Sequence, residues 1–116
     1  FLFLFLFLLF MVVCYSLSWT TTLFSSSSIY FLILLVPTAE EIYFRGYLQD
    51  HLETYFGKWV AIFGVGILFG MMHLPQGHGL EMGLLSIMLS LVFFWTRQLG
   101  WAILLHGIWN SIALYA

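Results

Sequence analysis

Residues 37–46 read Pro-Thr-Ala-Glu-Glu-Ile-Tyr-Phe-Arg-Gly and place three charged side chains, Glu40, Glu41 and Arg45, close together in one predicted helix. The rest of the chain is strongly apolar, because 63% of its 116 residues are hydrophobic and only 7% are charged. An Asp, Lys or Arg at the centre of a bilayer-spanning helix costs roughly 2.5 to 3.5 kcal/mol on insertion scales. A cluster of charges in such surroundings therefore indicates a functional site.

The composition is typical of an integral membrane protein, and 116 residues are enough for about five spanning helices of roughly 20 residues each. We therefore expect an all-α fold, a polytopic transmembrane bundle of about five helices. The formal net charge of −2 gives no reason to expect a nucleic-acid partner. The single cysteine, Cys14, cannot form an internal disulfide and is interpreted as a packing residue. The chain begins with Phe1 rather than Met, so we expect it to be a fragment of a longer protein.

Hydrophobic runs separated by polar or glycine-rich connections predict the helix boundaries. The predicted helices cover residues 1–19, 29–51 or 29–56, 59–73, 80–97 and 101–116. We divide the chain into an N-terminal transmembrane helix with a polar loop, residues 1–28, and a core of four helices, residues 29–116. Pro37 should kink the second helix or weaken its hydrogen bonding. The pair Gly66 and Gly70 should let a neighbouring helix approach closely.

Helical geometry separates the roles of the three charged residues. Glu41 and Arg45 lie one turn apart on nearly the same face, so they can pair and neutralise each other. Glu40 points away from Arg45 and is left as the carboxylate that is free to act as a general base. The simpler alternative is a salt bridge at a helix end in the membrane interface.

Two further motifs are Phe69-x-x-x-His73 and His106-x-x-x-Asn110. Taken alone, His73 reads as an interfacial residue, and His106 with Asn110 reads as hydrogen bonding between helices. Together with Glu40, however, they supply a carboxylate, two imidazoles and an amide from three helices. Amide hydrolysis needs such a set, in which a base takes a proton from water, a histidine positions that water and donors stabilise the oxyanion.

These three motifs, in this order, resemble those of the CPBP family, the CAAX proteases and bacteriocin-processing enzymes also called the Abi family of intramembrane proteases. The run Phe-Arg-Gly-Tyr-Leu-Gln at residues 44–49 is also similar, and the resemblance covers about residues 36–116. It implies that residues 29–116 form the catalytic core of a CAAX-protease-like fold. The resemblance implies that Glu40 activates the water and that His73 helps to position it. His106 and Asn110 would stabilise the oxyanion. Glu41 and Arg45 would be supporting groups.

The resemblance also implies the reaction and its setting. We expect an intramembrane endopeptidase that cleaves a membrane-associated peptide or lipidated protein, for example a prenylated CAAX-type substrate, surrounded by membrane lipid. A bacterial plasma membrane is preferred over the endoplasmic reticulum. We commit to no metal or cofactor. Zinc is the alternative, and its ligands would then be Glu40, His73 and His106.

Two other classes of function compete with the protease. One is a non-catalytic membrane immunity or scaffold protein of the same fold, for which Glu40→Ala and His106→Ala would leave function intact. The other is a small transporter or proton relay, which needs polar residues distributed across the membrane depth. The predicted helices 1–19 and 80–97 offer almost no such residues.

Overall fold

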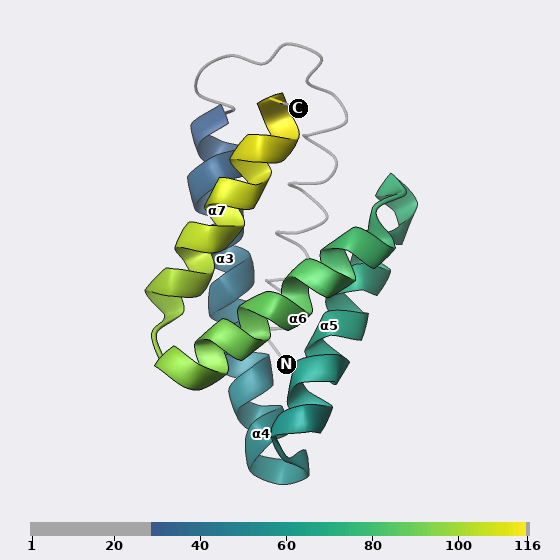
Figure 1. Ribbon diagram of the computed structural model, residues 1–116, viewed down its shortest axis with the longest axis vertical. Helices are drawn as coiled ribbons and strands as arrows, with labels where there is room; N and C mark the ends of the chain where they lie inside the picture. The colour runs from purple at the N-terminus through teal and green to yellow at the C-terminus, as the bar shows by residue number, and fades with distance from the viewer. Residues whose placement is uncertain (1–28, 116) are drawn as a thin grey trace, which may run out of the picture.

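The computed structural model describes residues 29–115, which are helical apart from short connections and contain no strand (Figure 1). The first helical rod runs without a break from residue 29 to residue 56. Its segments are η1 (Phe31–Leu35), α3 (Val36–Glu41), η2 (Ile42–Gln49) and α4 (Asp50–Phe56). Gly57 ends the rod with a φ of 84°, a backbone conformation that glycine adopts without steric cost. The longer form of the predicted second helix, residues 29–56, is therefore confirmed.

The segments η1 and η2 are π-helical, with wider turns than an α-helix. In η1 the N–H of Val36 donates to the carbonyl of Phe31 rather than to that of Leu32. Pro37 has no N–H, so it cannot supply the next donor along the helix. The carbonyl of Leu32 instead accepts a hydrogen bond from Nδ2 of Asn110 at 3.0 Å. The expected weakening of hydrogen bonding before Pro37 is confirmed, and a side chain from another helix compensates for it.

Three of the remaining helices follow the predicted boundaries within two residues, namely α5 (Lys58–Met72), α6 (Gly79–Thr96) and α7 (Leu99–Tyr115). The short η3 (Leu74–Gln76) lies between the predicted helices 59–73 and 80–97 and was not predicted. The predicted helix 1–19 and loop 20–28 lie outside the described residues. Of the described helices, α6 alone is both long and apolar enough to cross a bilayer, whereas α5 and residues 99–114 are apolar but shorter. The all-α fold is thus confirmed with one candidate span, and the five-helix polytopic bundle stays a prediction.

Helices α5 and α6 pack against each other where α5 ends and α6 begins, and they diverge from there (Figure 1). Their contact is lined by Gly66 and Gly70 on α5 and by Gly79 and Gly83 on α6, which we call the glycine seam. A Cβ atom on Gly70 would come within 2.6 Å of the carbonyl oxygen of Gly79. Close approach at Gly66 and Gly70 is therefore confirmed, and the glycines of α6 make it reciprocal.

Helices α3 and α7 form a second, antiparallel pair at the left of Figure 1. Helix α7 also packs against η1, where a Cβ added to Gly107 would meet the Ile33 carbonyl oxygen at 2.8 Å. Beyond α3 the first helical rod continues as η2, which packs against α5. Helix α6 passes across the front of the molecule (Figure 1). This arrangement encloses one face of each helix.

The enclosed faces carry buried polar side chains beside an apolar core, and the outer faces are apolar. The largest fully buried side chains include Arg45, His106, Gln49, Glu41, Ser86 and Ser90. Large apolar side chains are exposed on the outer surfaces of the helices, among them Leu34, Trp59, Ile67, Leu84 and Leu104. Polar groups inside and apolar groups outside are expected of a helix bundle whose outer surface meets lipid.

Candidate active site

The centre of the polar interior is the pair Glu41 and Arg45. Nη1 of Arg45 donates to Oε1 of Glu41 at 3.1 Å, and both side chains are fully buried. Nη2 of Arg45 donates across to α6, to the carbonyl and the hydroxyl oxygen of Ser86 at 2.6 and 2.7 Å. The predicted pairing of Glu41 with Arg45 is confirmed, and Ser86 extends it to a third group.

His106 lies between the two glutamates. Its Nδ1 is 2.7 Å from Oε1 of Glu41, and its Nε2 is 3.5 Å from Oε2 of Glu40. A carboxylate paired with a guanidinium is an acceptor only, so the Nδ1 that faces Glu41 must carry a hydrogen. Glu41 therefore fixes the orientation of the ring, and Nε2 is the nitrogen presented to Glu40. This contact between Glu41 and His106 was not anticipated from the sequence, because nothing in the spacing joins residues 65 positions apart.

Glu40 differs from its neighbour in sequence, Glu41. It is equally enclosed, with a side chain only 3% exposed. Within the described part of the chain its carboxylate forms no hydrogen bond, and its charged contact is the 3.5 Å approach to His106. Glu41 in contrast is engaged by both Arg45 and His106. Glu41 is thus the paired carboxylate, as predicted from its position on the helix, and Glu40 is the less engaged one.

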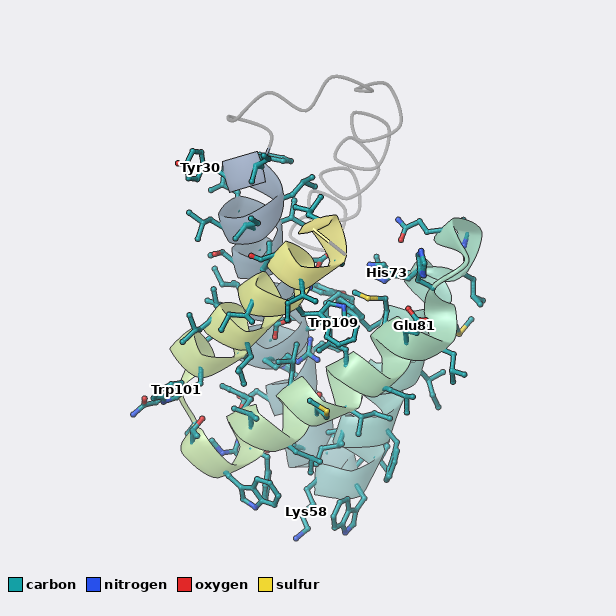
Figure 2. All side chains as sticks on the ribbon, turned by 45° about the horizontal axis from the view of Figure 1, so that its top comes forward. Tyr30, Lys58, His73, Glu81, Trp101 and Trp109 are labelled. Carbon is teal, nitrogen blue, oxygen red and sulfur yellow. The ribbon has the colours of Figure 1, made fainter. Side chains whose placement is uncertain are left out.

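His73 reaches the cluster through Phe69. It lies just after the last residue of α5, at the opposite end of that helix from Lys58 (Figure 2). Its Nδ1 is 2.8 Å from the Phe69 carbonyl, and its ring stacks on the Phe69 ring with centroids 4.6 Å apart. The same phenyl ring meets His106 edge-on at 5.7 Å. The guanidinium of Arg45 lies 5.6 Å from its centroid. The two imidazoles therefore share one aromatic neighbour, and no hydrogen bond joins His73 to Glu40 or His106 in residues 29–115.

Asn110 lies one turn beyond His106 on α7. Its Nδ2 donates to the carbonyl of Leu32 at 3.0 Å, so the amide ties α7 to η1. No hydrogen bond between described residues links Asn110 to Glu40 or to either histidine. The structure thus brings Glu40 and His106 into direct contact. Asn110 lies nearby on α7, where that helix meets η1.

Polar residues of α6 and η2 complete the interior and were missed in the sequence. Gln49 is fully buried and donates from Nε2 to the carbonyl of Ser90 at 3.0 Å. Ser86 and Ser90 recur at a four-residue interval on an otherwise apolar helix, and Arg45 and Gln49 have the same interval. This shared four-residue interval is the sequence signal from which the contacts of Arg45 with Ser86 and of Gln49 with Ser90 could have been predicted.

The described residues contain no group of three or more His, Cys, Asp or Glu side chains arranged to hold a metal ion. Glu40 and His106 are neighbours, but His73 contacts them through Phe69 rather than by sharing a common point with them. The zinc alternative with Glu40, His73 and His106 as ligands does not fit this arrangement, and we derive no step through a metal.

Comparison with known proteins identifies the family of the chain. The family model of the type II CAAX prenyl endopeptidase Rce1-like proteins matches residues 24–112, a span that includes every predicted site residue from Glu40 to Asn110. No curated protein and no solved structure matches the chain. The members of the matched family are membrane proteases, and the resemblance to CPBP-type proteases is thereby confirmed. The chain belongs to the Rce1-like family of type II CAAX prenyl endopeptidases.

Proposed function

We propose that the chain is an intramembrane endopeptidase that hydrolyses a peptide bond of a membrane-associated substrate, with Glu40 as the general base. The observation that carries this proposal is the contrast between two adjacent carboxylates. Glu41 is held by Arg45 and His106, whereas Glu40 is buried without a hydrogen bond among the described residues and faces Nε2 of His106 at 3.5 Å. A buried carboxylate with free lone pairs can take a proton from a water beside it.

In the proposed reaction Glu40 removes a proton from a water that His73 helps to hold. The resulting hydroxide attacks the carbonyl carbon of the scissile peptide bond, and the carbonyl oxygen gains negative charge. Asn110 donates a hydrogen bond to this oxyanion, and Nε2 of His106 donates a second one when the ring carries hydrogens on both nitrogens, because Nδ1–H is already engaged by Glu41. Glu40 then passes its proton to the leaving amine, so that one water is consumed and two peptide ends are released.

Glu41 and Arg45 support this chemistry without touching the substrate. Glu41 accepts from Nδ1 of His106, so it holds the ring with Nε2 directed toward the site. Such a carboxylate behind a histidine sets both its orientation and its tautomer. Arg45 in turn holds Glu41 and is anchored to α6 through Ser86. These hydrogen bonds therefore connect the first helical rod, α6 and α7 around the imidazole of His106.

The substrate class follows from the family, whose members cleave peptides or prenylated proteins in a membrane. For this chain we propose a lipidated, CAAX-type protein that reaches the site by lateral diffusion in the bilayer. The apolar outer surfaces of the helices would then face lipid. A bacterial plasma membrane is the proposed location.

The decisive test is hydrolysis of a prenylated, internally quenched peptide by the full chain in liposomes. Glu40→Gln removes the base but keeps the shape, and kcat should fall by about 10² to 10⁴. The matched control is Glu81→Gln, because the Glu81 side chain is 67% exposed at the start of α6 (Figure 2) and should retain the wild-type rate. Wild-type activity in Glu40→Gln would contradict the proposal. Stoichiometric zinc together with loss of activity on chelation would contradict the metal-free mechanism.

Asn110 requires a separate test because it already bonds to Leu32. An amide nitrogen carries two hydrogens, so Nδ2 can donate to Leu32 and to an oxyanion. Asn110→Ala should lower kcat by about 10² to 10³ if the amide serves the oxyanion. It should also lower stability by about 1 to 3 kcal/mol, because the Leu32 carbonyl loses its donor. Reduced stability with an unchanged kcat would leave Asn110 a purely structural role.

The second candidate is a non-catalytic immunity or scaffold protein of the same fold. The engagement of Asn110 with Leu32 favours it, as does the indirect contact of His73 with the glutamates. This candidate predicts binding of the prenylated peptide without cleavage, and binding that survives both Glu40→Gln and His106→Ala.

A further inference from the structure

Buried polar atoms without a partner gather in one part of the molecule. Among residues 29–115, the buried side-chain nitrogen and oxygen atoms that find no hydrogen-bond partner are Oε2 of Glu41, Nε of Arg45, Oε1 of Gln49 and Oγ of Ser90. Those of Arg45, Gln49 and Ser90 lie where η2 meets α6, and Glu41 on α3 is joined to them through Arg45. Each such atom costs about 1 to 3 kcal/mol if it stays unpaired. Their concentration in one connected network therefore calls for a common explanation.

These atoms belong to a regular row of side chains. Glu41, Arg45, Gln49 and Glu53 recur at four-residue intervals along the first helical rod, opposite Ser86 and Ser90 of α6. We call these six residues the polar ladder. Its cross-links are Arg45 to Ser86 at 2.6 and 2.7 Å, and Gln49 to the Ser90 carbonyl at 3.0 Å. The ladder is thus a continuous polar contact between two helices.

The two ends of the polar ladder differ in their surroundings. At the inner end Glu41 contacts His106, and both side chains are at most 1% exposed. At the outer end Nε2 of Gln49 donates to Oε1 of Glu53 at 2.8 Å. Oε2 of Glu53 then pairs with Arg97, whose side chain is 49% exposed. The ladder therefore connects the candidate active site to the surface at Arg97.

Water is the ligand whose chemistry suits these atoms. The unpaired groups include acceptors, a donor and a hydroxyl that can do both, and a water molecule can bond to all three kinds. Buried waters typically form two to four hydrogen bonds to polar groups that would otherwise be unsatisfied. A hydrolase with an apolar exterior also needs a route by which water reaches its base, because lipid cannot supply it.

We propose that the polar ladder binds a file of ordered waters, which leads from the surface beside Glu53 and Arg97 to the Glu41–His106 end of the active site. The file would replenish the water that each turnover consumes, and this role rests on the proposed hydrolytic function. The binding of water to the ladder does not depend on it. The two claims can therefore fail separately.

The first test is structural. An experimental structure of the full chain in lipid, at a resolution that shows waters, should contain waters within about 3.2 Å of Oε1 of Gln49 and Oγ of Ser90. Side chains of residues 1–28 bonded to these atoms would overturn the proposal, and so would a dry contact. Neither result would bear on whether the chain cleaves peptides.

The second test is kinetic. Ser90→Ala removes the hydroxyl without adding an atom to this fully buried site and keeps the backbone carbonyl that Gln49 uses. Together with Gln49→Leu it should lower kcat about tenfold or more, the rate equivalent of about 1.4 kcal/mol, with KM unchanged. Ser111→Ala is the matched control, because its hydroxyl already donates to the Gly107 carbonyl on its own helix at 2.8 Å.

The outcomes separate the two proposals. A double variant that loses these waters but keeps the wild-type kcat would overturn the role of the file in supplying water to the site. An inactive wild-type chain would count against the proposed function alone, and the structural test would still decide the ladder. Thermal unfolding of each variant checks that a lower kcat does not reflect loss of the fold.

Discussion

Helix α6 is held to two of its neighbours, α5 and η2, in opposite ways. Its first turns meet α5 at the glycine seam, where Gly79 and Gly83 leave room for the backbone of Gly66 and Gly70. Its middle turns meet η2 through Ser86 and Ser90, which accept hydrogen bonds from buried polar side chains. The seam depends on the absence of side chains, and the second contact depends on the presence of specific ones.

This difference has an energetic consequence. Close backbone packing gains many small dispersion contacts, so an intruding atom costs energy in proportion to the overlap it creates. A buried ionic network behaves differently, because removing one member leaves the remaining charge without compensation. We therefore expect the polar contact to be the more sensitive of the two to a single substitution.

The largest effect should come from Arg45→Met. It leaves Glu41 as a fully buried carboxylate without its guanidinium, and the loss should be about 3 to 5 kcal/mol of stability. Thermal or denaturant unfolding in detergent would measure it. The double variant Glu41→Met with Arg45→Met removes both charges and should recover part of this loss while activity stays low. A single variant as stable as wild type would mean that the network contributes nothing to holding α6.

A smaller effect is expected in the glycine seam. Gly70→Ala would place a Cβ 2.6 Å from the Gly79 carbonyl oxygen, and the overpacking should cost about 1 to 3 kcal/mol. Gly64→Ala is the control on the same helix, since its Cβ would meet only a Leu52 methyl group at 3.9 Å. The control should be neutral or stabilising by up to about 1 kcal/mol, because alanine favours the helix. Equal stability of the two variants would show that α5 and α6 can separate without penalty.

The smallest effect should follow Arg97→Ala at the outer end of the polar ladder. Arg97 pairs with Glu53, and a charged pair this close to solvent contributes about 0 to 1 kcal/mol. The loss should shrink as salt is added, because exposed pairs are screened. Comparing unfolding at low and high salt for Arg45→Met and Arg97→Ala would sharpen the contrast, since the buried pair should respond much less. A strong salt dependence at Arg45 would place that pair in contact with solvent.

Relations along a single helix could be predicted from the sequence. The boundaries of the described helices, the pairing of Glu41 with Arg45 and the close approach at Gly66 and Gly70 all follow from spacing and composition. Such features repeat with the helical period, so the order of residues encodes them directly. The division of the chain at residue 28 and the catalytic roles of the site residues stay predictions.

Relations between helices could not be predicted in the same way. The contact of His106 with Glu41 and the cross-link of Arg45 to Ser86 depend on how helices rotate and cross, which a local period does not specify. The π-helical turns were also missed. The one before Pro37 leaves a carbonyl that is satisfied only through Asn110, so its stability cannot be judged from neighbouring residues.

The bond between Asn110 and Leu32 has a consequence for biogenesis. The two residues are 78 positions apart, the donor on α7 and the acceptor on η1. While the ribosome is still making the intervening residues, Leu32 carries a carbonyl for which its own backbone has no donor. That defect is repaired only after α7 has been synthesised and has docked beside η1. A nascent chain released before residue 110 would therefore keep this carbonyl unsatisfied.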